Sequence, residues 1–437
     1  MSELKFIDLF AGCGGMSLGL QWAGFEHLTG IEKSEMAAET YFHNFHRSGD
    51  PDKAWADHLG FVQKKDYLNQ AKRGVVVAGV EKVLKDDATM QWLEKKQVDL
   101  LVGGPPCQGF SMAGRRNSDD HRNQLPQHFI KFIEKLHPRA VVVENVLGIN
   151  RRFAANAGRE STTDFEELCR RIAKIKVEVP DTGKEVGYVV QPLELNAAHY
   201  GVPQHRPRMF IVAVKADAVD MEANGDPLPL WRSRDFPEER VPPLAPRPSH
   251  SSKPVPAGEA LCDFEAGTYK LQGKRPPRRE YEERASRYAW EMRNGRNRWQ
   301  KVPDSHEHRR HNPKTEERFR LYRKLADLGI PSSVFALAAR RPKGGARTNA
   351  VEGFLRAKGE DLSDEDVRNL ARQISDLPTR KHSQQVLDPA KPSPTILTIP
   401  DDLIHPYEDR VMTVRELARL QSFPDSFTFH GRVTTGG

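Results

Sequence analysis

One cysteine in the first third of the chain is placed as a nucleophile would be. Cys107 lies in residues 103–111, which read Gly-Gly-Pro-Pro-Cys-Gln-Gly-Phe-Ser. The apolar run at residues 98–102 predicts a buried strand, and the glycines and prolines after it end that strand in a stiff loop. A lone cysteine is more often an inert apolar residue. A rigid loop at the end of a strand, where parallel sheets place their chemistry, instead favours a reactive thiol.

A reactive thiol needs an acceptor, and an acid further along the chain could create one. A thiolate adds to an electron-poor carbon, and protonation of a heterocyclic ring nitrogen makes such a carbon. Glu144 lies near the end of a strand predicted at residues 139–146, and it could supply the proton if burial raised its pKa. Alternatively, Glu144 is a buried acid paired with Arg206 or Arg208. Both interpretations can hold, because an arginine can bind a substrate and a carboxylate together.

A glycine-rich turn near the N-terminus indicates a nucleotide-type binding site. Residues 4–10 predict a strand, Gly12 and Gly14 lie in the turn after it, and a helix follows. Glycines let a ligand approach the backbone, and the start of a helix offers unpaired N–H groups. The next predicted strand, residues 27–31, leads into Glu32, which is placed to accept hydrogen bonds from a ribose.

The order of the elements that must position these residues predicts an α/β fold. A third strand is expected at residues 80–85, before Asp86 and Asp87, either of which could bind an adenine amino group or cap the following helix. Alternating strands and helices predict a doubly wound, mostly parallel sheet. The strands predicted at residues 188–195 and 208–214 leave no room for a helix between them. We expect them to form an antiparallel hairpin at one edge of the sheet.

Other segments are less regular. Residues 47–73 are polar and aperiodic, which predicts an insertion, and residues 228–256 are proline-rich, which is typical of a linker. Helices are predicted at residues 316–328, 363–374 and 413–420, and the last begins with the signature of a capping box.

Composition limits the class of protein. The chain has 437 residues, of which 38% are hydrophobic and 29% charged, as in a soluble globular protein of two or three domains. Its apolar runs fall short of the ~20 residues of a membrane span, and its N-terminus leads straight into a strand, so we expect no membrane association and no secretory signal. The four cysteines lack metal-ligand spacing, which argues against a metal site and favours a reducing cytoplasm.

The positive charge of the chain is concentrated in one region. The net charge is +7, but residues 270–347 alone contain 22 Lys and Arg against 9 Asp and Glu. Arginines there alternate with aromatic residues, as at Arg298 and Trp299. This pattern suits contacts with nucleic acid, although a solvated helical surface would have the same composition.

Six segments, in this order along the chain, resemble the motifs of the DNA (cytosine-5)-methyltransferases of bacterial restriction-modification systems. They are residues 8–15, 104–111, 120–125, 144–146, 204–208 and 410–425. The resemblance implies a seven-stranded sheet of the S-adenosylmethionine-dependent methyltransferase type. It implies transfer of a methyl group from S-adenosylmethionine to C5 of a cytosine that has been flipped out of duplex DNA. Cys107 would attack C6 while Glu144 protonates N3.

The resemblance also implies roles for further residues. Arg206 and Arg208 would hold the base and its phosphate. The residues expected to bind the methyl donor are Phe10, Gly12, Gly14, Glu32, Asp87, Pro106 and Leu125, with Asp87 preferred to Asp86. The residues expected to contact DNA are Gln108, Ser111, Gln204, Arg298 and Arg309. No metal is expected. The predicted domains are residues 1–214 for catalysis, 215–385 for target recognition with the proline-rich linker, and 386–437 for a segment after recognition.

The family pattern differs from this sequence at one point. Family members continue after the Phe-Pro-Asp of residues 423–425 to a last motif that completes the donor pocket, whereas this chain ends at Gly437 before it. Two alternatives therefore accompany the leading prediction: a sequence-specific DNA-binding protein without turnover, and a methyltransferase that acts on transfer RNA. The leading prediction is a monomeric, cytoplasmic, nucleoid-associated enzyme that binds double-stranded DNA and is paired with a restriction endonuclease.

Overall fold

The structure, a computed structural model, divides into two compact units that are described separately. It describes residues 3–46, 49–106, 125–147, 164–178, 183–219, 228–229, 240–241, 244–264, 287–293, 303–359, 361–381, 383–397 and 400–431. Within these residues, the first unit comprises Met1–Asn196, Pro207–Pro248 and Thr428–Arg432, and the second comprises Ala197–Arg206 and Ser249–Phe427. The predicted domain boundary after residue 214 thus falls inside the first unit, and the one after residue 385 falls inside the second.

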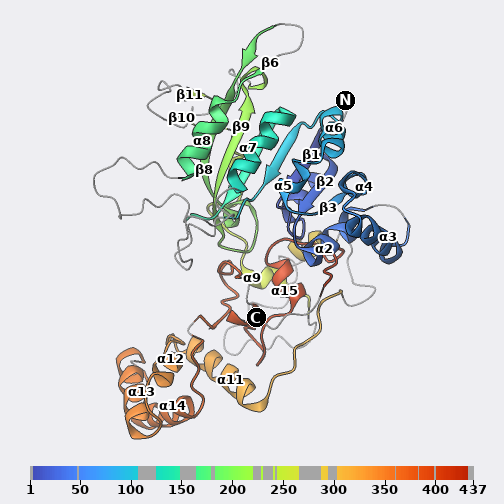
Figure 1. Ribbon diagram of the computed structural model, residues 1–437. Coiled ribbons are helices and arrows are strands. Elements are labelled where there is room, and N and C mark those ends of the chain that lie inside the picture. The colour runs from blue at the N-terminus through green and yellow to red at the C-terminus, as the bar shows by residue number, and fades with distance from the viewer. Residues whose placement is uncertain are drawn as a thin grey trace. The chain divides into compact units, whose positions relative to one another are not determined.

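The first unit is built on a seven-stranded sheet in the order β3-β2-β1-β4-β5-β9-β8 (Figure 1). The strands are β1 (Lys5–Leu9), β2 (Glu26–Glu32), β3 (Val75–Val77), β4 (Leu100–Gly103), β5 (Ala140–Asn145), β8 (Tyr188–Asn196) and β9 (Pro207–Lys215). All neighbours pair in parallel except β9, which is antiparallel to both β5 and β8. This confirms the predicted α/β fold, the mostly parallel sheet and its edge hairpin.

Helices cover both faces of this sheet. They are α1 (Gly15–Trp22), α2 (Glu35–Phe45), α3 (Pro51–Gln63), α4 (Tyr67–Lys72), α5 (Val80–Val83), α6 (Asp87–Lys95), α7 (Leu125–Leu136) and α8 (Asp164–Lys174). Apolar residues of α5, α6, α7 and α8 share one core with the strand residues that point to their face, including Ile7, Leu101 and Val141. On the opposite face, Met16 and Leu20 of α1 pack against Phe6 and Val102. Two short ladders, β6 (Val177–Glu178) with β7 (Glu185–Val186) and β10 (Leu228–Pro229) with β11 (Arg240–Val241), lie outside the main sheet.

The third strand differs from its prediction. It is Val75–Val77, whereas the predicted residues 80–85 lie in and just after the short helix α5. Three consecutive β-branched residues suit a buried strand, and the residue before α5 is Gly79, in extended conformation, so the chain turns into a helix there. The insertion predicted at residues 47–73 contains two helices, α3 and α4.

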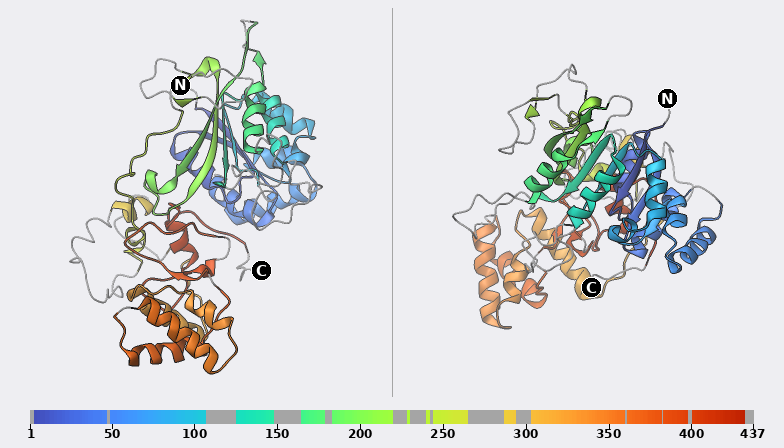
Figure 2. Two further views of the ribbon diagram at one scale, coloured as in Figure 1. Left: turned by 90° about the vertical axis from the view of Figure 1, so that its left-hand side faces the viewer. Right: turned by 45° about the horizontal axis from the view of Figure 1, so that its top comes forward.

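The second unit is mainly helical. Its elements are α9 (Ala257–Leu261), α11 (Pro313–Asp327), α12 (Val334–Ala339), α13 (Gly345–Lys358), α14 (Asp364–Asp376), α15 (Val414–Arg419), β12 (Gln385–Val386) and β13 (Leu403–Ile404). Helices α11 to α14 gather into one bundle (Figure 2), whose core contains Phe319, Phe335, Leu355 and Leu370. Helices α11, α14 and α15 confirm the three predicted helices, and α15 opens with the expected capping box between Thr413 and Glu416.

Buried arginines hold the second unit together around α15. Arg410 donates two hydrogen bonds to the carboxylate of Glu416, at 2.9 and 2.8 Å. Arg419, which is fully buried, forms ion pairs with Asp263 and Asp425, each at 2.7 Å. Removing one member of a buried ion pair leaves the other unpaired, which typically costs about 3–5 kcal/mol. The motif at residues 410–425 is therefore a structural element of this unit.

Among the described residues, none of the helices has both the length and the apolar character that crossing a membrane would require.

A buried histidine in α3 makes the stability of the first unit depend on pH. The His58 ring is fully buried and lies between Trp55 and Phe42, with ring centroids 5.3 and 4.8 Å away. Burial, together with the charges of Arg73 and His46, lowers the pKa of His58 to about 4. Between pH 6.5 and 4 the unfolded chain therefore binds a proton at this residue that the folded chain does not bind.

We expect the free energy of unfolding to fall as the pH is lowered through that window, and His58→Leu to remove part of the fall. The pH dependence should differ between the wild type and this variant by roughly 3 kcal/mol between pH 7 and pH 4. Urea unfolding followed by tryptophan fluorescence measures it, because Trp55 contacts the ring. The control is Lys53→Gln, an exposed substitution in the same helix, which should keep the wild-type slope. Equal slopes for His58→Leu and the wild type would contradict the assignment.

Candidate active site at the carboxyl edge of the sheet

The parallel strands bring the predicted functional residues of the first unit to one edge of the sheet. β1, β2, β3, β4 and β5 run in the same direction, so their carboxyl ends lie together. The glycine turn follows β1, Glu32 ends β2, the proline-rich loop follows β4, and Glu144 is the penultimate residue of β5. Ligands bind at this edge in open α/β sheets.

The glycine turn and Glu32 form one hydrogen-bonded unit. The backbone N–H of Gly12 donates to Glu32 Oε2 at 2.9 Å, and that of Ser34 donates to Oε1 at 2.7 Å. Gly12 and Gly14 have φ of +55° and +98°, a backbone conformation that residues other than glycine rarely adopt. Each carboxylate oxygen keeps further acceptor capacity. The predicted juxtaposition of the glycine turn and Glu32 is therefore present in the structure.

A row of buried, hydrogen-bonded side chains packs next to this turn. Ser17 Oγ donates to Asp8 Oδ2 at 2.7 Å and lies 2.7 Å from Tyr41 Oη, which lies 2.8 Å from His27 Nε2. Burial raises the pKa of Asp8 to about 7; the hydrogen bond from Ser17 opposes this shift, and the charge of Glu32 adds to it. These hydrogen-bonded side chains link β1, α1, α2 and β2.

Glu144 and Arg208 form an ion pair at the far side of the edge. Arg208 Nε lies 2.9 Å from Glu144 Oε1, and the two side chains are 15% and 26% exposed. Arg208 is the second residue of β9, whose residues Met209 and Phe210 pair with Asn145 and Glu144 of β5. The alternative of an acid paired with Arg208 is therefore realised, with both groups still partly accessible.

The loop that carries the cysteine is anchored beside this pair. The buried Asn145 donates a hydrogen bond from Nδ2 to the carbonyl oxygen of Pro105 at 3.1 Å. A Cβ atom on Gly104 would lie 3.1 Å from Glu144 Oε2, so glycine at this position lets the carboxylate approach the loop. Cys107 is two residues beyond Pro105, and it lies outside the described residues together with Gln108, Ser111 and Arg298.

The other residues predicted to bind the methyl donor are placed as follows. Phe10 has φ of 59° and packs partly buried against the core, Leu125 is the first residue of α7, and Pro106 is exposed. Asp87 is the first residue of α6, and Asp86 caps that helix by accepting a hydrogen bond from Thr89 N at 2.8 Å.

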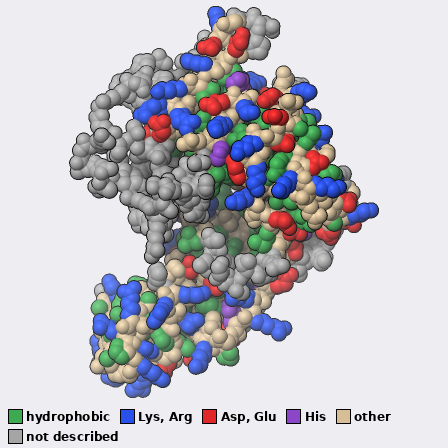
Figure 3. All heavy atoms as spheres, in the orientation of Figure 1, with side chains coloured by type: hydrophobic (Ala, Val, Ile, Leu, Met, Phe, Trp, Pro, Cys, Tyr) green, Lys and Arg blue, Asp and Glu red, His purple; other side chains and the backbone are tan. Residues whose placement is uncertain are grey.

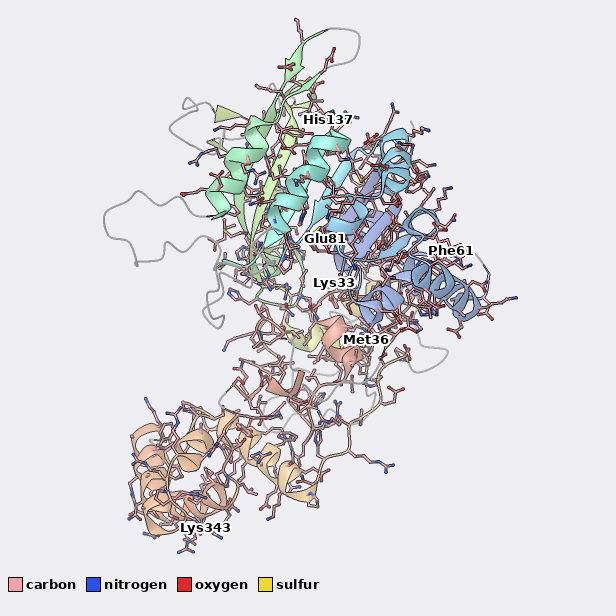
Figure 4. All side chains as sticks on the ribbon, in the orientation of Figure 1. Lys33, Met36, Phe61, Glu81, His137 and Lys343 are labelled. Carbon is pink, nitrogen blue, oxygen red and sulfur yellow. The ribbon has the colours of Figure 1, made fainter. Side chains whose placement is uncertain are left out.

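An acid missed in the sequence, Glu81, follows β3 more closely along the chain than Asp87 does. Glu81, in α5, folds its carboxylate over Gly79, where a Cβ atom would overlap it. Figure 4 labels Glu81 together with Lys33, which directly follows Glu32. Locating β3 at Val75–Val77 would have revealed Glu81.

Three of the predicted DNA-contacting or base-holding residues belong to the second unit. Gln204 is fully buried and pairs with Ser393 through a β-bridge, and Arg206 is partly buried nearby in sequence. Arg309 forms an ion pair with Asp401 at 2.7 Å. The predicted contacts of Gln204 and Arg309 with DNA stay predictions.

One cluster has metal-ligating side chains, but its geometry does not favour a metal ion. Glu39, His43 and His430 each offer one ligand atom, and these atoms lie within 4.8 Å of one another. The two imidazoles are stacked, with centroids 3.7 Å apart and planes at 16°. Imidazole lone pairs lie in the ring plane, so two parallel rings do not converge on one ion. The stack instead joins α2 to residues 428–431, where Asn44 and Thr40 exchange hydrogen bonds with the backbone of Thr428 and His430.

The three cysteines in the described residues are poor nucleophiles. Burial raises the pKa of Cys13 and Cys169, and it raises that of Cys262 to about 12. A thiol with a raised pKa carries little thiolate at neutral pH.

The sequence matches one family model over nearly its whole length. The model of the C-5 cytosine-specific DNA methylases matches residues 4–436. The chain is 28% identical to the type II methyltransferase M.DdeI of Desulfomicrobium norvegicum, covering 99% of this chain and 81% of that protein. It is also 28% identical to the type II methyltransferase M1.HphI of Haemophilus parahaemolyticus, covering 98% of this chain and 80% of that protein.

A solved structure shares the fold. An E. coli prophage protein, crystallised as a candidate DNA modification methyltransferase, superposes with a TM-score of 0.51 at 22% identity. The alignment covers 98% of this chain and 91% of that chain.

Substitution of Gly14 tests the left-handed conformation of the glycine turn. Gly14→Ala would place a left-handed alanine whose Cβ overlaps the Phe45 ring and lies 3.0 Å from Tyr41. We expect it to lower the free energy of unfolding by about 2 kcal/mol or more, as measured by urea denaturation. Gly19→Ala is the matched control: Gly19 lies inside α1 with nothing within 4 Å of a Cβ atom, so alanine should stabilise the fold by roughly 0.5–1 kcal/mol. Equal stability of the Gly14→Ala variant and the wild type would refute the strained turn.

Proposed function

The chain belongs to the C-5 cytosine-specific DNA methylase family, and on this premise we propose that Glu144 and Arg208 hold and activate the cytosine that Cys107 attacks. The activity is transfer of a methyl group from S-adenosylmethionine to C5 of cytosine in DNA. The observation that carries the assignment of residues is the Glu144–Arg208 pair beside the anchored loop that leads to Cys107.

The proposed reaction proceeds through a covalent adduct. The Cys107 thiolate bonds to C6 of the flipped cytosine while Glu144 donates a proton, or a hydrogen bond, to N3. As the thiolate adds, the electrons of the C5–C6 double bond shift to C4–C5. C5 then attacks the methyl carbon of S-adenosylmethionine, whose sulfur–methyl bond breaks to leave S-adenosylhomocysteine. A base, which we take to be water, removes the C5 proton. The C5–C6 double bond re-forms and the C6–sulfur bond breaks, which returns the Cys107 thiolate, and the N3 proton goes back to Glu144.

Two features of the chain support these roles. The other three cysteines are described residues with raised pKa values, which leaves Cys107 as the candidate thiol. Arg208 lies beside Glu144 with a planar guanidinium that suits the base carbonyl as well as the carboxylate. Arg206 would hold the neighbouring phosphate.

The donor site would be formed by the glycine turn and Glu32. Glu32 would accept hydrogen bonds from the ribose hydroxyls, and the turn after β1 would lie against the rest of the nucleoside, with Phe10 at its start. Glu81 is a second acid at the same edge of the sheet, and Asp87 remains the prediction from the family pattern. The proposed chemistry needs no metal ion.

The biological setting follows from the relatives. Both relatives named above are type II methyltransferases, so we propose that this enzyme is the modification partner of a restriction endonuclease. It would act as a monomer on double-stranded DNA, in the cytoplasm and in contact with the nucleoid.

Replacing Glu144 should separate binding from chemistry. We expect Glu144→Gln to bind duplex DNA about as well as the wild type but to transfer tritiated methyl groups at least ~100-fold more slowly, because an amide cannot deliver the proton. Arg170→Lys is the control, because Arg170 pairs with Glu167 within α8 and has no proposed part in the reaction. A wild-type rate for Glu144→Gln would overturn the proposal.

Adduct trapping tests the nucleophile, and a comparison of nucleic acids tests the substrate. DNA with 5-fluorocytosine should trap a denaturant-resistant adduct with the wild type, because the C5–F bond does not break, and Cys107→Ser should form none. Methyl transfer to transfer RNA in preference to duplex DNA would favour the alternative substrate. DNA binding without any transfer or adduct would favour a binding protein without turnover.

Glu32 provides the test of the donor site. We expect Glu32→Gln to weaken binding of S-adenosylmethionine by roughly 10–100-fold in calorimetry, because charge-assisted hydrogen bonds to the ribose are lost. Glu35→Gln, an exposed acid in the first turn of α2, should bind the donor as the wild type does. Equal weakening in both variants would show that the effect is general electrostatics.

A further inference from the structure

A short basic segment between α12 and α13 is exposed and is not explained by the catalytic site. Residues 340–345 read Arg-Arg-Pro-Lys-Gly-Gly, and all six are exposed. We call them the basic loop. The loop lies on the helical bundle of the second unit, and Figure 4 shows Lys343 at the outer end of this bundle with its side chain directed away from the helices.

Hydrogen bonds from the following helix hold the backbone of the basic loop. Arg347 donates hydrogen bonds from Nε and Nη2 to the carbonyl oxygen of Arg341, at 3.2 and 2.9 Å, and from Nη1 to that of Ser375 at 3.1 Å. Pro342 restricts φ within the loop. Gly344 caps α13 with φ of +115°. A loop fixed in this way loses little conformational entropy when it binds a partner.

The charges of the basic loop are not neutralised by its surroundings. Arg340, Arg341 and Lys343 form no ion pair with any described residue. Other arginines of the bundle do form such pairs: Arg323 pairs with Asp409 at 2.6 Å, and Arg356 pairs with Asp364.

The helix after the loop adds to its positive potential. The first turn of α13, which lies wholly within the described residues, contains no acid. The positive end of this helix dipole is therefore uncompensated, and it points toward the loop. Figure 3 shows Lys and Arg side chains gathered over the surface of the bundle.

We propose that the basic loop binds the phosphodiester backbone of the substrate DNA, independently of sequence. Lysine, arginine and helix N-termini are the groups that contact phosphates in protein–DNA complexes. Arginine can also read guanine in the major groove, so the test below compares duplexes of unrelated sequence. The inference rests on the proposed function, because it takes the DNA substrate from there. Unlike the cations of the basic loop, Arg309, which the sequence predicts to contact DNA, is paired with Asp401.

The expected consequence is a change in the salt dependence of binding. Each phosphate neutralised by a cation contributes about 0.9 to the slope of log K against log salt. Replacing Arg340, Arg341 and Lys343 together by glutamine should therefore reduce the slope by about 2.7, if each contacts one phosphate. The affinity for a duplex should fall at least ~10-fold at physiological salt, and by the same factor for duplexes of unrelated sequence.

The experiment compares two triple variants of the full chain with equal net charge. The test variant is Arg340→Gln/Arg341→Gln/Lys343→Gln. The control is Lys314→Gln/Lys358→Gln/Arg368→Gln, which removes three exposed cations of the same bundle outside the loop. Fluorescence anisotropy with 40-base-pair duplexes of two unrelated sequences gives the affinity and the salt slope. Circular dichroism at 222 nm checks that the bundle remains folded.

The outcomes separate this proposal from the catalytic one. A smaller salt slope and weaker binding for the test variant alone, with an unchanged methyl-transfer rate at saturating DNA, would support the loop as a phosphate contact. Equal losses in the two variants would overturn it in favour of general electrostatics, and a loss confined to one duplex sequence would overturn it in favour of base reading. Wild-type binding by the test variant would also overturn it. Because anisotropy needs no turnover, failure of methyl transfer would not affect this result.

Discussion

The ion pair between Glu144 and Arg208 depends on the one reversal of direction in an otherwise parallel arrangement. β9 runs antiparallel to β5, so the start of β9 meets the end of β5, and Arg208 reaches the acid that the parallel strands place at their common edge. Both side chains are partly exposed, and such pairs contribute only about 0–1 kcal/mol to stability. The pair is therefore better explained by the position it gives to two functional groups than by the stability it adds. A sheet with a parallel neighbour at this place would bring the wrong end of the strand to Glu144.

The sequence predicts the edge of the sheet well because its signals are local. A glycine turn after an apolar run, an acid after the next strand and a cysteine between prolines are each read within a few residues, and the structure places Gly12, Glu32 and Pro105 accordingly. Elements that depend on distant packing are missed. A strand of three residues such as β3 is too short to show a period, and helix α3 is organised by the contacts of His58 and Trp55 with Phe42 of α2. The burial of Gln204 and the pairing of Arg309 with Asp401 also arise from contacts distant in sequence, so composition could not predict them.

The rigidity of the glycine turn has a cause that lies outside the turn. Tyr41, from α2, occupies the space beneath it, and its hydroxyl joins Ser17 and His27. A Cβ atom on Gly30 would lie 2.6 Å from the Tyr41 ring, and one on Gly14 would lie 3.0 Å from it. One glycine in the turn after β1 and one in β2 are thus needed to admit one aromatic residue. Burial also raises the pKa of Tyr41, so its hydroxyl stays protonated and keeps its hydrogen bonds over the pH range in which Asp8 titrates.

Arginine has opposite uses in the two parts of the second unit. Arg410, Arg415 and Arg419 are buried and bind carboxylates or backbone carbonyls, so their charges organise the fold and are unavailable to a ligand. In the basic loop the carbonyl of Arg341 is held by Arg347, while the side chains of Arg340 and Arg341 remain in solvent. A free arginine pays little desolvation before it meets a phosphate, whereas a paired one must first lose its partner. Local pairing therefore distinguishes the positive charges of this region from one another, which the excess of lysine and arginine over residues 270–347 by itself does not.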